Sequence, residues 1–294
     1  MRYDFGSDNT AGMAPSAVDG LVRANEAFAR AYGADEITAR AADAIRARLD
    51  ADAEVRFVFS GTAANAIALS MLAQPFEAVL AHNSAHVCTD ETGAPGFFGH
   101  GVGLIGLPGF SGKIDPLALH AQLDEPEVGH RQPPAALTLT QATEYGAVYT
   151  EEELRHLIEP AKLRGFGVHM DGARLANAAA AGFDLTQIAR LGVDVLVFGG
   201  AKAGGPCAEA IVLFDKSLAR RLDNRLKQAG QTASKARLLS GPLLGLLESG
   251  DWDAGAAHAN LMAQRLAAGI AARSPFVLAH PVEANAVFVR MPEE

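Results

Sequence analysis

The segment Ser60-Gly61-Thr62 has the residue types of a phosphate-binding turn. It joins a strand-like run to a helix-like run, so free backbone N–H groups and the positive end of the helix dipole would face a ligand. Gly61 would let the backbone approach that ligand, and Thr62 would add a hydroxyl donor. A plain helix N-cap without a ligand explains the segment equally well when it is considered alone.

Asp171 ends another strand-like run, in the sequence HMDGAR. A carboxylate at this position can simply cap the next helix at the surface, which is the more common arrangement when such a residue is considered alone. Arg174 follows three residues later and could pair with Asp171. The two side chains could instead hold a protonated heterocycle nitrogen and a carboxylate, respectively.

Lys202 follows the run DVLVF within the sequence FGGAKAGGP, where four glycines make the backbone permissive. A lysine held at a strand end can serve as an imine-forming nucleophile. The interval from Asp171 to Lys202 is long enough for one helix and one strand, so the two strands are expected to be neighbours. A phosphate cradle, a carboxylate and an imine-forming lysine together match what pyridoxal phosphate needs, and the combination is more specific than any member.

Strand-like and helix-like patterns alternate along most of the chain. This alternation predicts an α/β fold, with a mostly parallel sheet and helices on both faces. Ligands of such a sheet lie beyond the carboxyl ends of its strands, where the three segments above are found. The expected strands are 55–60, 77–81, 104–107, 136–140, 167–171 and 194–200, and the expected helices are 35–49, 64–72, 115–122, 150–165 and 185–192.

Two local patterns mark boundaries. Thr150 and Glu153 form a capping-box pattern at the start of the 150–165 helix. The run SGPLLGL at 240–246 resembles a hinge into a smaller C-terminal part. We therefore expect a large domain over 1–240, with an N-terminal arm, and a small C-terminal domain over 241–294.

Composition narrows the class of protein. Twenty-five basic and 34 acidic residues give a net charge of −9, which opposes binding to the phosphate backbone of nucleic acids. Two cysteines require no disulfide framework, and no apolar run is long enough to span a membrane. We expect a cytoplasmic protein that binds neither nucleic acid nor membranes.

Two other motifs are weak. The run GVGLIG at 101–106 fits a dinucleotide-binding pattern but lacks a preceding strand and a following helix. His82, His86 and Cys88 lack a fourth ligand at a recognisable spacing, so no metal site is expected.

A series of ordered motifs runs through nearly the whole chain: FGSDN, RAYGAD, SGTAANAIAL, SAHVCTDETGAPGFF, TQATEYG, HMDGAR, DVLVFGGAKAG, KQAGQTASKARLLSGP, HANLMAQ and PVEANAVFVRMPE. In this order and spacing, the chain resembles the low-specificity threonine aldolases. These are pyridoxal-phosphate enzymes of the aminotransferase-like fold type I, often grouped with β-eliminating lyases.

The resemblance implies how the cofactor is held. Lys202 would form the imine with pyridoxal phosphate, and Asp171 would pair with its pyridine nitrogen. Gly61 and Thr62 would hold the phosphate. Lys227, in KQAGQ, would reach a phosphate across a subunit interface, so the resemblance also implies a homodimer or homotetramer.

The resemblance also implies roles toward an amino-acid substrate. His86 would stack on the cofactor ring near the substrate hydroxyl, whose proton it could remove. Glu144 stands where other members carry a histidine, so a base role shared with His86 is left open. Arg174 would bind the substrate carboxylate or the cofactor's phenolic oxygen, and Ser7 would line the substrate pocket.

The chain departs from the family pattern in two places. It reads GGAKAG around the lysine where the family usually reads GGTKNG, so Ala201 and Ala203 supply no hydrogen bonds to the cofactor. It ends at MPEE where members continue, so the small domain is expected to be incomplete and to lack a carboxylate-binding arginine. The implied activity is cleavage of threonine-type β-hydroxy-α-amino acids to glycine and an aldehyde. β-Elimination, or a non-catalytic cofactor-binding subunit, are the alternatives.

Overall fold

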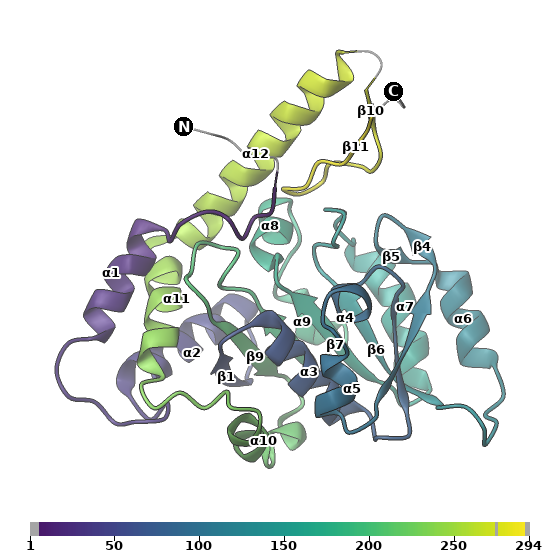
Figure 1. Ribbon diagram of the computed structural model, residues 1–294, viewed down its shortest axis with the longest axis horizontal. Helices are drawn as coiled ribbons and strands as arrows, with labels where there is room; N and C mark the ends of the chain where they lie inside the picture. The colour runs from purple at the N-terminus through teal and green to yellow at the C-terminus, as the bar shows by residue number, and fades with distance from the viewer. Residues whose placement is uncertain (1–5, 274–275, 292–294) are drawn as a thin grey trace.

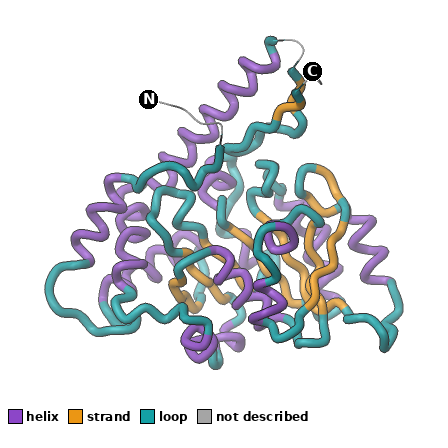
Figure 2. Tube along the Cα trace, viewed as in Figure 1, coloured by secondary structure: helices purple, strands orange, loops and turns teal. Residues whose placement is uncertain are grey.

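The computed structural model describes residues 6–273 and 276–291. A seven-stranded sheet in the order β1-β9-β8-β7-β6-β2-β3 forms its centre (Figures 1 and 2). All neighbouring strands are parallel except at β9, which pairs antiparallel with both β1 and β8. The strands of the sheet are β1 (Glu54–Val58), β2 (Ala78–His82), β3 (Gly103–Leu107), β6 (Pro134–Thr140), β7 (Gly167–Gly172), β8 (Val195–Phe198) and β9 (Glu209–Leu213).

Helices cover both faces of this sheet, which confirms the expected α/β class. The sheet helices and their neighbours are α2 (Glu36–Leu49), α3 (Gly61–Leu72), α4 (His86–Thr89), α5 (Ala94–Phe98), α6 (Pro116–Asp124), α7 (Glu151–Leu163), α8 (Leu175–Ala180), α9 (Gln187–Arg190) and α10 (Leu222–Gln228), with a 3₁₀ turn at Lys216–Ala219. The remaining elements are α1 (Pro15–Ala24), α11 (Arg237–Ser249) and α12 (Asp251–Ala271), and the strand pairs β4 (Gly109–Phe110) with β5 (Lys113–Ile114) and β10 (Val277–Leu278) with β11 (Val289–Arg290).

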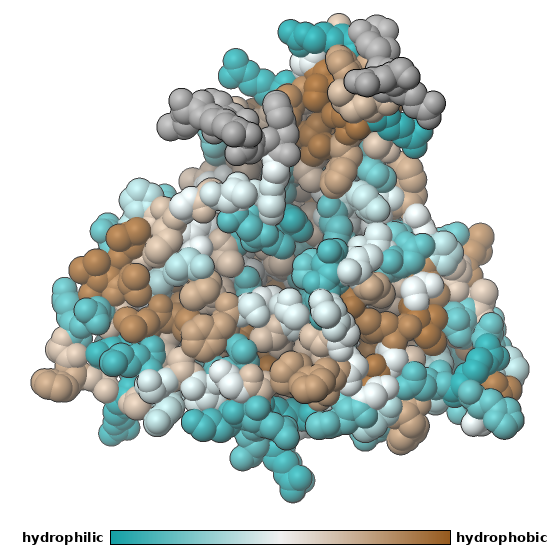
Figure 3. All heavy atoms as spheres, viewed as in Figure 1, coloured by the Kyte–Doolittle hydropathy of each residue, from teal (hydrophilic) through white to brown (hydrophobic). Residues whose placement is uncertain are grey.

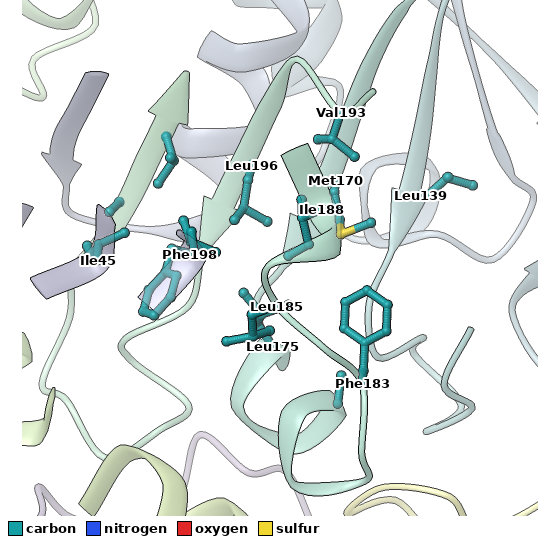
Figure 4. Packing of buried hydrophobic residues seen from close by; sticks show 14 of the residues in the cluster. Ile45, Leu139, Met170, Leu175, Phe183, Leu185, Ile188, Val193, Leu196 and Phe198 are labelled. Atoms are coloured by element: carbon teal, nitrogen blue, oxygen red, sulfur yellow. The ribbon is translucent and has the colours of Figure 1, made fainter. Parts of the chain in front are cut away.

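The two faces of β8 show why a fully buried strand reads as a continuous apolar run. Val195 and Val197 pack on the side of α3 and α10, whereas Leu196 and Phe198 point to the opposite side. Figure 4 shows that opposite side, where Leu196 and Phe198 lie with Ile188 of α9 in one buried cluster. The sheet is therefore rigidly held between two hydrophobic layers.

The capping box expected at Thr150 and Glu153 is present at the start of α7. One expected element is shorter than the sequence indicates: the helix expected over 185–192 is limited to the single turn α9. The strand β9 is an additional element that the sequence pattern does not predict. β9 lies between β1 and β8 in space although it follows both in the chain, so its position depends on tertiary pairing.

The run 240–246 is a continuous buried part of α11, so the expected hinge at this segment is wrong. Its glycines allow α1 and α11 to approach closely. A Cβ added at Gly245 would overlap the carbonyl oxygen of Ser16, and one at Gly20 would overlap the carbonyl oxygen of Gly241. The small residues therefore allow the two helices to pack closely. A run that contains several glycines is found in closely packed helices as well as in flexible turns.

After α11, the chain enters α12, which projects from the sheet-containing body (Figure 1). Trp252 anchors the base of α12. Its ring stacks on Phe198 with centroids 5.0 Å apart, and its indole N–H donates to the Gly199 carbonyl at 3.1 Å. The chain end at 292–294 and residues 1–5 lie outside the described residues. No helix of the described part is long and apolar enough to cross a membrane.

Candidate active site

The segments after β6, β7 and β8 meet at one edge of the sheet. These strands are parallel neighbours in register, with Thr140 opposite Asp171 and Gly172 opposite Phe198. The Gly199 N–H donates to the Gly172 carbonyl at 3.1 Å, so the loop that carries Lys202 leaves the sheet beside Asp171. The expectation that these two strands are adjacent is confirmed.

The N-terminus of α3 opens toward free space. The Ser60 hydroxyl caps the helix by accepting the Ala63 N–H at 3.3 Å. The backbone N–H groups of Gly61 and Thr62 have no hydrogen-bond partner within the described ranges 6–273 and 276–291. A Cβ built on Gly61 would meet no atom within 4 Å. The segment therefore presents the unpaired donors that a phosphate group requires.

Asp171 is a buried carboxylate held by two N–H donors. The Asn65 side-chain amide donates to it at 2.9 Å, and the Ala173 backbone N–H donates at 2.9 Å. Burial opposes ionisation, but the neighbouring His169, the Ala173 N–H, Asn65 and the charge of Lys202 together keep the pKa of Asp171 below its usual value. The side chain therefore carries a negative charge that a protonated ring nitrogen could neutralise.

Lys202 lies within reach of several acidic groups. Its positive charge lowers the pKa values of Asp8, Asp171 and Glu209. The Glu209 carboxylate accepts the Gly200 N–H at 2.8 Å and so holds the start of the lysine loop. Burial is the main cause that raises the pKa of Glu209 to about 7.

His86 occupies the first turn of α4 and has two acidic neighbours. Its Nδ1 lies 2.9 Å from the Glu91 carboxylate, and its backbone N–H donates to Glu144 at 2.9 Å. Thr140 also donates to Glu144, at 3.0 Å. Both pKa values are raised, for different reasons. Burial raises the pKa of Glu144, and the hydrogen bond to Glu91 raises the pKa of His86.

Arg174 does not pair with Asp171 but with Asp8 of the N-terminal segment. Its Nε and Nη2 atoms donate to the two Asp8 oxygens at 2.7 and 3.1 Å. Asn285 donates to the same carboxylate at 3.1 Å. Burial opposes ionisation of Asp8, but Arg174 holds its pKa below the usual value. Ser7 is exposed beside this pair and accepts hydrogen bonds from Asn9.

Lys227 does not join the other predicted residues within this chain. Its ammonium lies over the Tyr32 ring, 5.2 Å from the ring centroid. Both residues line a cavity of about 800 Å³ between α2, β1 and α10. Neither Gly61 nor Asp171 lines this cavity.

Four further polar side chains belong to the site and were not assigned a role from the sequence: Asp8, Asn65, Glu91 and Glu209. Asn65 is a buried amide on an otherwise apolar stretch of α3, which is the one signal that could have drawn attention to it. The partners of Asp8, Glu91 and Glu209 are brought close only when the chain folds, so no sequence pattern marks these three residues.

This arrangement fits pyridoxal phosphate. The open α3 terminus supplies unpaired N–H donors for a phosphate, Asp171 supplies a buried anion for a pyridinium, and Lys202 supplies an amine at the same edge of the sheet. Within residues 6–273 and 276–291, Asp8 forms its salt bridge with Arg174 and not with Lys202, which forms none. Its amine is thus available to a carbonyl group.

Comparison with known proteins agrees with this geometry. Residues 4–294 match the family model described as beta-eliminating lyase. The low specificity L-threonine aldolases of a Pseudomonas species and of Pseudomonas aeruginosa are 45% and 43% identical over 291 residues, which cover 98% of this chain and 84% of each relative. The structure of threonine aldolase from Leishmania major superposes with a TM-score of 0.92 at 33% identity, over 98% of this chain and 84% of that one. The chain therefore belongs to the beta-eliminating lyase family.

Proposed function

We propose that this protein is a pyridoxal-phosphate-dependent aldolase that cleaves L-threonine- and allo-threonine-type β-hydroxy-α-amino acids to glycine and an aldehyde. The observation that carries this proposal is the meeting of Gly61–Thr62, Asp171, Lys202 and His86 at one sheet edge. Relatives with more than 40% identity over almost the whole chain are named for this activity.

The residues that would hold the cofactor have distinct tasks. Gly61 and Thr62 would bind its phosphate, Asp171 would pair with its ring nitrogen, His86 would lie against its ring, and Lys202 would supply the amine for its carbonyl group. The chemistry that the bound cofactor would supply is an electron sink for the electron pair of the Cα–Cβ bond of the substrate. Asp171 favours the protonated ring because its own charge is retained in a buried position.

His86 is the base that removes the proton of the substrate β-hydroxyl. Its imidazole is partly exposed, whereas the Glu91 carboxylate beside it is buried. Glu144 has a raised pKa and already accepts the His86 backbone N–H, so it holds α4 in place and shares the base role through water.

Arg174 binds the substrate carboxylate or the cofactor's phenolic oxygen. Asp8 orients the guanidinium through two hydrogen bonds. Ser7, the exposed residue before Asp8, would line the substrate pocket. The remaining N–H donors of Arg174 stay available to a second anion, because a guanidinium has five.

The test is product analysis. Purified protein with pyridoxal phosphate is incubated with L-threonine and L-allo-threonine, and glycine and acetaldehyde are measured. Equal amounts of the two products support the aldolase. Formation of ammonia and a 2-oxo acid in place of glycine would support β-elimination instead. Absence of all products in a protein that holds the cofactor would support a non-catalytic subunit.

Further proposals concern the assembly and its setting. Exposed apolar side chains on α1 and the following loop, among them Val22, Phe28 and Tyr32, support a homodimer or homotetramer. Lys227 would then reach a phosphate bound in a neighbouring subunit. We also propose a large domain over 1–240 and a small C-terminal domain over 241–294, with their boundary inside the continuous helix α11, and a cytoplasmic location, which the two free cysteines favour.

A further inference from the structure

The imidazole of His86 touches a carboxylate that the proposed reaction has not used. The Glu91 side chain is fully buried (0% exposed), whereas the His86 side chain is 40% exposed. One Glu91 oxygen accepts both of its hydrogen bonds, from His86 Nδ1 at 2.9 Å and from the Asn65 amide at 2.8 Å. The other oxygen has no partner in the described part of the chain. A buried carboxylate is costly, so this arrangement calls for a physical explanation.

The same Asn65 amide also donates to Asp171, at 2.9 Å. Its two N–H bonds therefore join two buried carboxylates that would otherwise repel each other. His86, Glu91, Asn65 and Asp171 form a continuous chain of hydrogen bonds from the exposed imidazole to the carboxylate at the end of β7.

We propose that Glu91 is a positioning residue that keeps the Nδ1–H tautomer of His86, so that Nε2 is the atom that accepts the proton of the substrate hydroxyl. This inference rests on the proposed aldolase function and extends it. An ionised carboxylate can only accept, so the hydrogen bond to Glu91 places the proton on Nδ1. Nε2 then keeps a free lone pair.

The proton and electron balance of the step is simple. The β-hydroxyl proton moves to Nε2, the oxygen electron pair forms the aldehyde C=O bond, and the Cα–Cβ electron pair leaves with the glycine fragment. Glu91 stabilises the imidazolium that results. Asn65 keeps Glu91 and Asp171 in fixed positions, so that the base and the ring-binding acid are oriented together.

Other charged groups also face His86. Glu144 lies at its backbone N–H, and Asp171 raises its pKa, whereas Lys202 lowers it. Cys88, on the same helix, is close enough to Glu91 and Glu144 for both to raise its pKa. The pKa of His86 should therefore fall on removal of Glu91, because burial and Lys202 both lower it and only Asp171 still raises it.

The test uses nitrogen NMR of histidine-labelled protein, in which the tautomer is read directly. His86→Gln assigns the resonances. We expect the wild type to show a protonated Nδ1 and an unprotonated Nε2. Glu91→Gln removes the charge but keeps an acceptor, so the tautomer should persist while the pKa of His86 falls. Glu91→Leu removes both the charge and the acceptor, so both tautomers of His86 should be populated. Glu125→Gln, at an exposed ion pair with Arg131, is the matched control and should change neither the tautomer nor the pKa of His86.

A kinetic measurement on the same variants accompanies the NMR test. In Glu91→Gln, kcat for threonine cleavage should fall about tenfold with little change in KM, because a less basic imidazole accepts the proton more slowly. The acidic limb of the pH profile should move to lower pH.

An unchanged tautomer and pKa of His86 in Glu91→Gln and Glu91→Leu would overturn the proposal, even if the protein is an aldolase. If Glu91→Leu does not fold, an unchanged pKa in Glu91→Gln is decisive by itself. Absence of threonine cleavage by the wild type would overturn the proposed function and the acceptor role of Nε2, whereas the tautomer of His86 would still test the role of Glu91.

Discussion

Among the single residues of the site, there are more acidic side chains than the proposed reaction requires. Glu209 is the clearest example, because it lies buried at the start of β9 and accepts the Gly200 N–H beside the lysine loop. Burial raises its pKa to about 7, while Lys202 acts in the opposite direction. Glu209 therefore links the position of the lysine loop to pH.

This link predicts a pH-dependent stability. The unfolded chain releases the Glu209 proton near pH 4.5, and the folded protein keeps it until about pH 7. The folded state therefore binds more protons between these values, and its stability falls as the pH rises. Relative to Glu209→Gln, the wild type should lose about 2 to 3 kcal/mol of unfolding free energy between pH 5 and pH 8.

Urea denaturation of both proteins at the two pH values measures this difference. Glu125→Gln serves as the control, because Glu125 is exposed and its replacement should leave the pH dependence as in the wild type. A constant difference between the wild type and Glu209→Gln across the range would contradict the account.

The sequence identified the residues whose types are diagnostic beside a strand end. Lys202, Asp171 and the Gly61–Thr62 turn each follow a recognisable strand-like run, so alternation alone places them at one edge. The partner of Arg174 could not be read in this way. Asp8 lies 166 positions away, and only the folded chain brings the two side chains together.

At the scale of elements, the contact between α1 and α11 depends on glycine. Gly20, Gly241 and Gly245 leave no room for a Cβ, because backbone carbonyl oxygens or Ala24 of the facing helix occupy that space. These small residues give the run at 240–246 the sequence pattern of a hinge, although they form a packed helix. β9 was missed because its neighbours in the sheet are distant in sequence, whereas parallel strands separated by helices follow the local pattern.

Replacement of Gly245 by alanine should be destabilising. The new methyl group would overlap the Ser16 carbonyl, and separation of the helices should cost about 1 to 3 kcal/mol. Gly255, on the exposed side of α12, offers the matched control, since an added Cβ meets nothing within 4 Å. Gly255→Ala should stabilise the protein by about 0.5 to 1 kcal/mol.

Thermal and urea denaturation of the two variants test this contrast. The account of α1 and α11 as a tightly packed pair fails if Gly245→Ala is as stable as the wild type.

At the scale of the whole molecule, hydrophobic surface lies over α1, as Figure 3 shows. Val18 and Val22 of this helix are exposed, and Phe28 in the following loop is fully exposed. Contiguous exposed apolar side chains of this kind mark interaction surfaces. The cavity that holds Lys227 and Tyr32 adjoins the same loop, which agrees with a role of Lys227 in a neighbouring subunit.

The proposed assembly predicts the effect of a charge on this surface. Val22→Asp should shift the protein toward the monomer, because burial of an unpaired carboxylate in an interface is unfavourable. Leu163→Asp, at an exposed apolar position on α7, should leave the mass unchanged. Light scattering coupled to size-exclusion chromatography measures both. A monomeric wild type would reject the assembly.

We propose that the amine of Lys202, the carboxylate of Asp171 and the α3 terminus hold one pyridoxal phosphate. Borohydride reduction of the loaded protein, followed by peptide mass spectrometry, tests it most directly. The reduced cofactor should be covalently attached to the peptide that contains Lys202, and Lys202→Ala should carry none. Attachment to another lysine, or an unmodified Lys202 peptide in a protein that retains the cofactor, would contradict it.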